Sequence, residues 1–261
     1  MNSIKDALAR AIQKESEKLY TPKEYFRISS MGKCHRAQIA ERAGMLPTVP
    51  PTDRARFLMW TGTVLHKEAQ KLLISSGFML PGYITINPDG TTTEKEVRYR
   101  SYLGHPDGAT KINDALYIAE LKTCDDDAII KNGVERDWQE HYFWQGLAYA
   151  LAENAVGVLF FQLGKAQGLS REKIVLVTQD WRDKINTEIA GIDKDWEQYK
   201  LTGCLPPCQH RFRWEDKLCS YRDSTPAKPT KPQDYNPFRA TPQEQDLADW
   251  LDAPPGGDNG A

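Results

Sequence analysis

Hydrophobic residues recur every three to four positions in several segments of the chain, which is the spacing of an amphipathic helix. Ile4, Leu8 and Ile12 show this spacing near the start and predict a helix at residues 4–19. Ser29 and Ser30 can cap a second helix, which we expect to run through Cys34 to residue 43. The same pattern predicts further helices later in the chain, the last one capped by Asp180: residues 53–74, 137–153 and 180–201.

Shorter runs are rich in β-branched and aromatic residues and are bounded by glycine, proline and asparagine, as strands are. We expect six strands, at residues 83–87, 95–102, 108–112, 115–122, 155–163 and 173–178. Gly104, Gly108 and the pair Asn113–Asp114 supply turns around the third and fourth strands. The expected order is three helices, four strands, one helix, two strands and a last helix, so the chain is of mixed α/β type.

Composition separates a folded body from a tail. The chain has 261 residues, of which 40% are hydrophobic, enough for one core of roughly 200–220 residues. Residues 224–261 hold seven of the sixteen prolines, so we expect a domain at 1–223 and a disordered tail at 224–261. Leu247, Trp250 and Leu251 fall on one helical face of the tail, either as a docking helix at 246–252 or as a stray apolar cluster.

The charge of the chain predicts a small basic groove at most. The formal net charge is −2, and the tail carries three basic and six acidic residues, which leaves the body at +1. Basic residues form local clumps, and Arg36, Arg211 and Arg213 are candidate DNA contacts beside cysteines. Arg36 could instead be a solvated surface residue. No apolar run approaches the roughly 18 residues of a membrane helix, so no membrane partner is expected.

Two carboxylates and a lysine indicate metal-assisted chemistry. Asp107 precedes one predicted strand, and Glu120 and Lys122 lie near the end of the next. Side chains alternate along a strand, so Glu120 and Lys122 point to the same face. Paired carboxylates bind a hard divalent cation, and a nearby ammonium suits hydrolysis of a phosphodiester. Asp107 could instead be a turn residue, because Pro-Asp-Gly is a strong turn signal.

The companions of this set resemble one branch of a nuclease superfamily. His66 lies in a predicted helix upstream, and Gln145 and Tyr149 share one face of a helix downstream. This order of His, Asp, Glu-x-Lys and Gln-x-x-x-Tyr is similar to the RecB-type branch of the PD-(D/E)XK nucleases. The resemblance implies a restriction-endonuclease-like core, in which helices flank a central mixed sheet.

The resemblance also implies roles for the residues. His66, Asp107, Glu120 and the backbone carbonyl of Leu121 would bind Mg²⁺ or Mn²⁺, and the histidine nitrogen favours Mn²⁺. Lys122 would act on the water or the phosphate. Gln145 and Tyr149 would support the lysine side of the site. On the residues alone, His66 could be a core histidine, Gln145 a surface residue and Tyr149 a core tyrosine.

Four of the five cysteines form a pattern of metal ligands. The first twenty residues have no apolar leader core, so we expect a cytoplasmic protein without disulfides. Cys34 stands alone near the start, whereas Cys204, Cys208 and Cys219 lie within sixteen residues. The pattern resembles iron–sulfur RecB-type exonucleases, such as CRISPR-associated and AddB-type nuclease domains. It implies a [4Fe–4S] cluster that joins the N- and C-terminal segments, with structural zinc as the alternative.

These observations predict a metal-dependent DNA exonuclease that acts in recombination, repair or end processing, in a bacterial or phage-infected cell. The expected substrate is single-stranded DNA or DNA with free ends, and the tail is a candidate docking segment for a recombinase or a single-strand-binding protein. Two alternatives stay open at this point: a structure-specific endonuclease on the same fold, and a non-catalytic, metal-stapled DNA-binding module. Cys124 is expected to be a buried small hydrophobe.

Overall fold

The computed structural model describes residues 11–12, 22–49, 52–165, 167–212, 215 and 219–221. Of the helix predicted at residues 4–19, only Ala11 and Ile12 are described, and both are helical. The tail at 224–261, with its candidate docking segment, lies outside the described residues, as does Arg213. Among the described residues, no helix combines the length and the apolar character that crossing a membrane requires.

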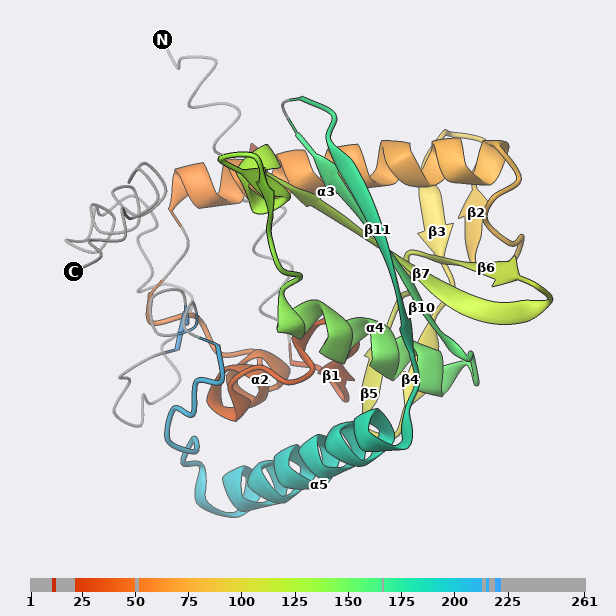
Figure 1. The fold of residues 1–261 in the computed structure, drawn as a ribbon. Helices are drawn as coiled ribbons and strands as arrows, with labels where there is room; N and C mark the ends of the chain where they lie inside the picture. The colour runs from red at the N-terminus through yellow and green to blue at the C-terminus, as the bar shows by residue number, and fades with distance from the viewer. Residues whose placement is uncertain are drawn as a thin grey trace, which may run out of the picture.

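The described residues form a mixed α/β fold with four α-helices and several sheets (Figure 1). The helices are α2 (His35–Arg42), α3 (Asp53–Ser75), α4 (Glu140–Ala152) and α5 (Gln179–Thr202). The strands are β1 (Phe26–Arg27), β2 (Ile84–Ile86), β3 (Thr92–Glu94), β4 (Val97–Tyr99), β5 (Tyr102–Gly104), β6 (Gly108–Ile112), β7 (Ala115–Cys124), β8 (Ile130–Lys131), β9 (Val134–Glu135), β10 (Gly157–Gly164) and β11 (Ser170–Leu176).

The largest sheet has the strand order β11-β10-β7-β6. Strands β6 and β7 form an antiparallel hairpin, β10 runs parallel to β7, and β11 runs antiparallel to β10. The sheet is therefore mixed, with the long strand β7 in its interior. The predicted strand at 108–112 is confirmed, and the next one extends two residues further, to Cys124.

Helices α3 and α4 cover opposite faces of this sheet. The Lys122 Nζ donates to Gln145 Oε1 of α4 at 3.0 Å, whereas the hydroxyl of the next residue, Thr123, is 3.5 Å from the Gly62 carbonyl of α3. Successive side chains of a strand point to opposite faces, so these two contacts place the helices on different sides. Figure 1 shows α3 crossing behind the strands. Strand β7 thus lies between the two helices, with Lys122 on the face that α4 covers.

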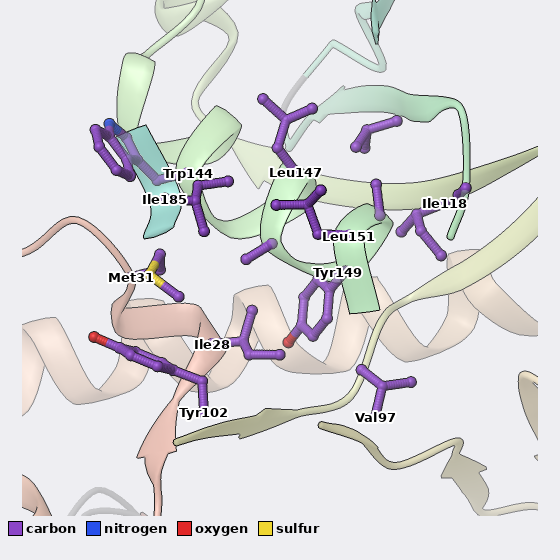
Figure 2. Packing of buried hydrophobic residues seen from close by; sticks show 14 of the residues in the cluster. Ile28, Met31, Val97, Tyr102, Ile118, Trp144, Leu147, Tyr149, Leu151 and Ile185 are labelled. Atoms are coloured by element: carbon purple, nitrogen blue, oxygen red, sulfur yellow. The ribbon is translucent and has the colours of Figure 1, made fainter. Parts of the chain in front are cut away.

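The core lies between the sheet, α4 and α5. Fully buried side chains include Leu147 of α4, Phe160 of β10 and Ile185 of α5, and Figure 2 shows how Leu147 and Ile185 approach Met31 and Tyr149. A Cβ on Gly146 would come within 2.7 Å of the Phe160 ring, so glycine allows α4 to lie close to the sheet. Each such buried side chain contributes about 1.5–3 kcal/mol through burial, which holds α4 rigidly against β7.

The strand predicted at 95–102 is instead a tight hairpin of β4 and β5. Arg100 adopts a φ of 54° at the reversal, a left-handed conformation that a strand pattern does not reveal for arginine. A second sheet follows from this reversal, because β5 then also pairs in parallel with β1. The hairpin turns the chain so that β5 leads directly towards Asp107.

Two predicted helix starts are also corrected. Residues Ile28–Ser30 form a short 3₁₀ helix, and α2 begins only after Cys34, which is its N-cap residue. Helix α5 is capped by Thr178, whose hydroxyl accepts a hydrogen bond from the Trp181 amide at 3.3 Å. Asp180 lies inside the first turn, where a negative charge favours the positive end of the helix dipole.

Candidate active site

Asp107 lies just before β6 and links α3 to β7. Its Oδ1 is 3.1 Å from Nε2 of His66, and its Oδ2 accepts a hydrogen bond from the Leu121 amide at 2.7 Å. Asp107 as a whole residue is 8% exposed. Burial lowers the pKa of His66, but the charge of Asp107 and its hydrogen bond outweigh burial and raise that pKa. The side chain of Asp107 is therefore held by contacts with two elements, α3 and β7.

Glu120 and Lys122 lie on one face of β7, as their spacing predicts. The Lys122 Nζ donates to Glu120 Oε1 at 2.5 Å, and it also lies 5.3 Å from the centre of the Tyr142 ring. Burial lowers the pKa of Lys122, but the charges of Glu120 and Asp107 outweigh burial and raise it. The lysine is therefore a firmly held cation beside two carboxylates.

Glu120 is buried with only one of its two carboxylate oxygens in a hydrogen bond among the described residues. Its side chain is inaccessible to solvent, at 0% exposure. Oε2 has no hydrogen-bond partner among the described residues. Burial, with the nearby charge of Asp107, raises the pKa of Glu120 to about 7. A carboxylate oxygen left without a partner in the interior is costly, and a bound cation would remove that cost.

Gln145 and Tyr149 extend the lysine side of the site. Gln145 accepts from Lys122 through Oε1 at 3.0 Å and also hydrogen-bonds to the Tyr149 hydroxyl. The His105 backbone hydrogen-bonds to the same hydroxyl, and burial raises the pKa of Tyr149. Figure 2 shows Tyr149 among the core side chains, with its hydroxyl beside Ile28. The two residues therefore connect Lys122 to the core in one hydrogen-bonded row.

The sequence pattern did not indicate Glu94 and Gln70, two further residues that lie beside Asp107. Glu94, at the end of β3, brings a carboxylate oxygen within 4.8 Å of ligand atoms of His66 and Asp107. Gln70 is completely buried and hydrogen-bonds to both Glu94 and Asp107. Glu94 follows a threonine-rich segment that carries no local signal. Gln70 lies four residues after His66, so its shared helix face was the available clue.

The donor set of this site fits a divalent cation. Carboxylate oxygens with one imidazole nitrogen suit Mg²⁺ or, better, Mn²⁺. The three-residue group of His66, Glu94 and Asp107 does not include Glu120, whose Oε1 is paired with Lys122. The arrangement therefore combines a cation site with a separate, fixed ammonium group, which together can stabilise negative charge on a phosphate.

A second group of metal-ligating side chains lies at the junction of the N- and C-terminal segments. One ligand atom each of Cys34, Cys208, His210 and Cys219 lies within 4.8 Å of the others. Three of the four predicted cysteines are thus brought together, but Cys204 is not in the group and is exposed. His210 stands in its place. Its position two residues after Cys208 was the signal that could have identified it.

Buried polar contacts hold this junction together. The Cys34 amide donates to Oε1 of Glu215 at 2.8 Å, while Oε2 accepts from the amides of Arg211 and Phe212. A hydrogen bond with Cys219 lowers the pKa of the Cys34 thiol, and the same bond raises the pKa of Cys219. A thiol pair that shares a proton is ready to lose it to a metal.

Of the two described arginines near the cysteines, Arg36 has a structural role and Arg211 is exposed. Arg36 is buried and donates to the backbone carbonyls of Tyr221 and Pro206. It therefore joins α2 to the C-terminal segment, whereas the sequence had suggested a contact with DNA. Arg211 is exposed, pairs with Glu188 at 2.7 Å and lies over the Trp144 ring. Arg211 therefore still presents part of its guanidinium to solvent. Cys124 is half-buried.

No protein-family model matches the chain, and no curated protein matches it either. Among solved structures, one titled crystal structure of SSO0001 is 14% identical, covers 83% of this chain and 93% of its own, and has a TM-score of 0.48. An alkaline exonuclease, LHK-Exo from Laribacter hongkongensis, is 17% identical over 56% of this chain and 73% of its own, with a TM-score of 0.38.

LHK-Exo in complex with dAMP is 15% identical, covers 68% of this chain and 96% of its own, and has a TM-score of 0.39. At these identities and TM-scores, the function has to be inferred from the residues of the site.

Proposed function

We propose that this protein is a divalent-metal-dependent deoxyribonuclease that hydrolyses phosphodiester bonds from DNA ends. The observation that carries the proposal is the pairing of Lys122, which is half-buried, with the buried Glu120, beside buried Asp107 and its contact with His66. A fully buried carboxylate such as Glu120 is hard to explain by stability alone, because burying a charge costs several kcal/mol. The choice of an exonuclease follows from the resemblance to the RecB-type nucleases.

Each residue has a distinct task in this proposal. His66, Asp107, Glu120 and the Leu121 carbonyl would hold Mg²⁺ or Mn²⁺, which supplies an activated water and charge neutralisation when bound. Lys122, fixed by Glu120 and Gln145, aims its ammonium at the charge that builds on the phosphate. Tyr149 and Gln145 keep the lysine from rotating away. A fixed donor needs no reorganisation during the reaction, which is where its catalytic value lies.

Cleavage of end-labelled DNA by two variants tests the proposal. Glu120→Gln and Lys122→Ala should reduce Mn²⁺-dependent cleavage at least about a hundredfold, the usual loss on removing one stabilising group. Their binding of DNA and their folding should change little. Glu172→Gln, an exposed residue of β11, is the matched control. Cleavage at the wild-type rate by both active-site variants would exclude the nuclease assignment.

We further propose that the cysteine group binds a structural metal that joins the two ends of the domain. In a tetrahedral site with ligand atoms ~2.3 Å from one ion, the ligands lie roughly 4 Å apart. The separations of up to 4.8 Å in the group of Cys34, Cys208, His210 and Cys219 suit such an ion after slight closure. Three thiolates and one imidazole form a closed zinc site.

An iron–sulfur cluster is the alternative to zinc at this site. Its fourth ligand would be Cys204 instead of His210. Each cysteine of a [4Fe–4S] cluster binds a different iron, so the sulfurs lie farther apart than around one ion. That cluster would need the exposed Cys204 to join the group. Metal analysis and visible absorbance of anaerobically purified protein distinguish the two.

The zinc site predicts one zinc per chain, lost in His210→Ala and kept in Cys204→Ser. A brown protein that loses its colour in Cys204→Ser would establish the cluster instead. Cys124→Ser is the control, because Cys124 lies outside the group and should change neither the metal nor the colour.

A further inference from the structure

A third carboxylate lies beside Asp107 and is supplied by a separate part of the fold. Glu94 ends β3, which pairs with β2 in a small antiparallel sheet outside the four-stranded one. Its carboxylate oxygen, one oxygen of Asp107 and one ring nitrogen of His66 lie within 4.8 Å of one another. Three elements, α3, β3 and the start of β6, thus converge on one point.

Gln70 fixes Glu94 to this point. It lies one helical turn after His66 on α3, on the same face. Its Nε2 donates to Oε1 of Glu94 and to the backbone carbonyl of Asp107, both at 3.0 Å. Both partners can only accept, so the amide nitrogen must be the group that faces them. Gln70 is 0% exposed, and the contact therefore holds Glu94 without competition from water.

An independent observation indicates that a ligand belongs here. Oε2 of Glu120, fully buried, has no hydrogen-bond partner among the described residues. The charges of Asp107 and His66 both act on Glu120, which places it next to the same group. Several acceptors that face one another in the interior repel, and a cation between them removes the repulsion. The site therefore gathers three carboxylates around one imidazole and one ammonium, and one carboxylate oxygen has no partner among the described residues.

We propose that Glu94 is a ligand of the divalent cation and that Gln70 is its positioning residue. The proposal rests on the nuclease function above and adds a third carboxylate to the ligands that the sequence indicated. A site with three carboxylates and one imidazole binds a small hard cation more tightly than a site with two. Glu94 also ties the β2–β3 hairpin to the site, so metal binding would stabilise that hairpin.

Titration of the metal-free full-length protein with Mn²⁺, followed by electron paramagnetic resonance of the free ion, tests the proposal. Glu94→Gln should raise the Kd for Mn²⁺ about tenfold or more, and Gln70→Leu should raise it by a smaller factor, as loss of supporting contacts does. Glu96→Gln is the matched control. Glu96 is exposed and lies two residues further along the chain, so the variant has the same change of net charge without loss of a ligand.

The outcomes separate this proposal from the function on which it rests. If wild type binds Mn²⁺ and cleaves DNA while Glu94→Gln binds Mn²⁺ as Glu96→Gln does, Glu94 is not a ligand and the nuclease assignment stands. If wild type binds no Mn²⁺, both proposals are overturned. Thermal unfolding without metal shows whether each variant is folded, and a Gln70→Met variant, similar in length and without the amide donor, replaces Gln70→Leu if the latter unfolds.

Discussion

Replacing Glu120 with glutamine should remove a pH dependence that the buried site imposes on the metal-free protein. Burial raises the pKa of Glu120 from 4.5 to about 7 in the folded state. Between these two values the unfolded chain has released this proton, while the folded protein retains it. The contribution of Glu120 to stability is therefore fully present below pH 4.5 and is lost as the pH rises through 7.

The size of this effect follows from the linkage relation. One extra proton in the folded state lowers the free energy of unfolding by about 1.4 kcal/mol per pH unit. Over the interval from 4.5 to about 7, the loss sums to about 3 kcal/mol for a residue that is 0% exposed. This is a large part of the stability of an ordinary domain, so metal-free protein should be noticeably weaker at pH 8 than at pH 5.

Urea unfolding in the presence of a chelator, at half-unit steps from pH 4.5 to 8, measures the dependence. The free energy of unfolding of wild type minus that of Glu120→Gln should fall by about 3 kcal/mol between pH 4.5 and about 7. The free energy of unfolding of Glu172→Gln should follow that of wild type at every pH. Equal slopes for wild type and Glu120→Gln would refute the reasoning, because the proton would then belong to another group. Saturating Mn²⁺ should flatten the wild-type curve, since a metal ligand has to be ionised.

Three further outcomes are expected. His66→Ala should weaken cleavage at low Mn²⁺ and recover part of it at high Mn²⁺; an unchanged metal titration would make His66 a packing residue. Gly104→Ala should destabilise the fold by about 1–3 kcal/mol, because its Cβ would come within 2.7 Å of the Tyr149 hydroxyl; adding Tyr149→Phe should recover part of the loss in melting temperature. Removal of residues 224–261 should leave cleavage of free DNA unchanged, as their proline-rich, acidic composition predicts; a large loss of activity would place the domain boundary further along the chain.

The placement of Glu120 and Lys122 on one face of β7 could be predicted, because it depends only on the geometry of neighbouring residues in a strand. The alternation of side chains along a strand is enough to put Glu120 and Lys122 on one face, and the structure has them in contact. Helical spacing placed Gln145 and Tyr149 on one face, and the resemblance to the RecB-type nucleases placed them on the lysine side; Gln145 Oε1 does accept a hydrogen bond from Lys122. Long strands and helices such as β7 and α3 also follow from periodicity, because many residues contribute to each signal.

The remaining contacts depend on how distant segments meet. Glu94 joins the site only because the β2–β3 hairpin folds towards α3, and no feature of its neighbours in sequence indicates this. The left-handed Arg100 divides one predicted strand into two for a similar reason, since arginine has no marked preference for that conformation. His210, and not Cys204, lies in the group with Cys34. The path of the segment after α5 decides which side chains face Cys34, and the number of cysteines in the sequence does not reveal that path.

Incubation of the purified protein with linear and circular single-stranded DNA, in Mn²⁺ or in a chelator, tests the central claim most directly. The account predicts that the linear strand is degraded only in Mn²⁺, that the circle survives, and that Lys122→Ala leaves both intact. Cleavage of the circle would indicate an endonuclease at the same site. Survival of the linear strand in both Mn²⁺ and Mg²⁺, or its degradation by Lys122→Ala at the wild-type rate, would contradict the account.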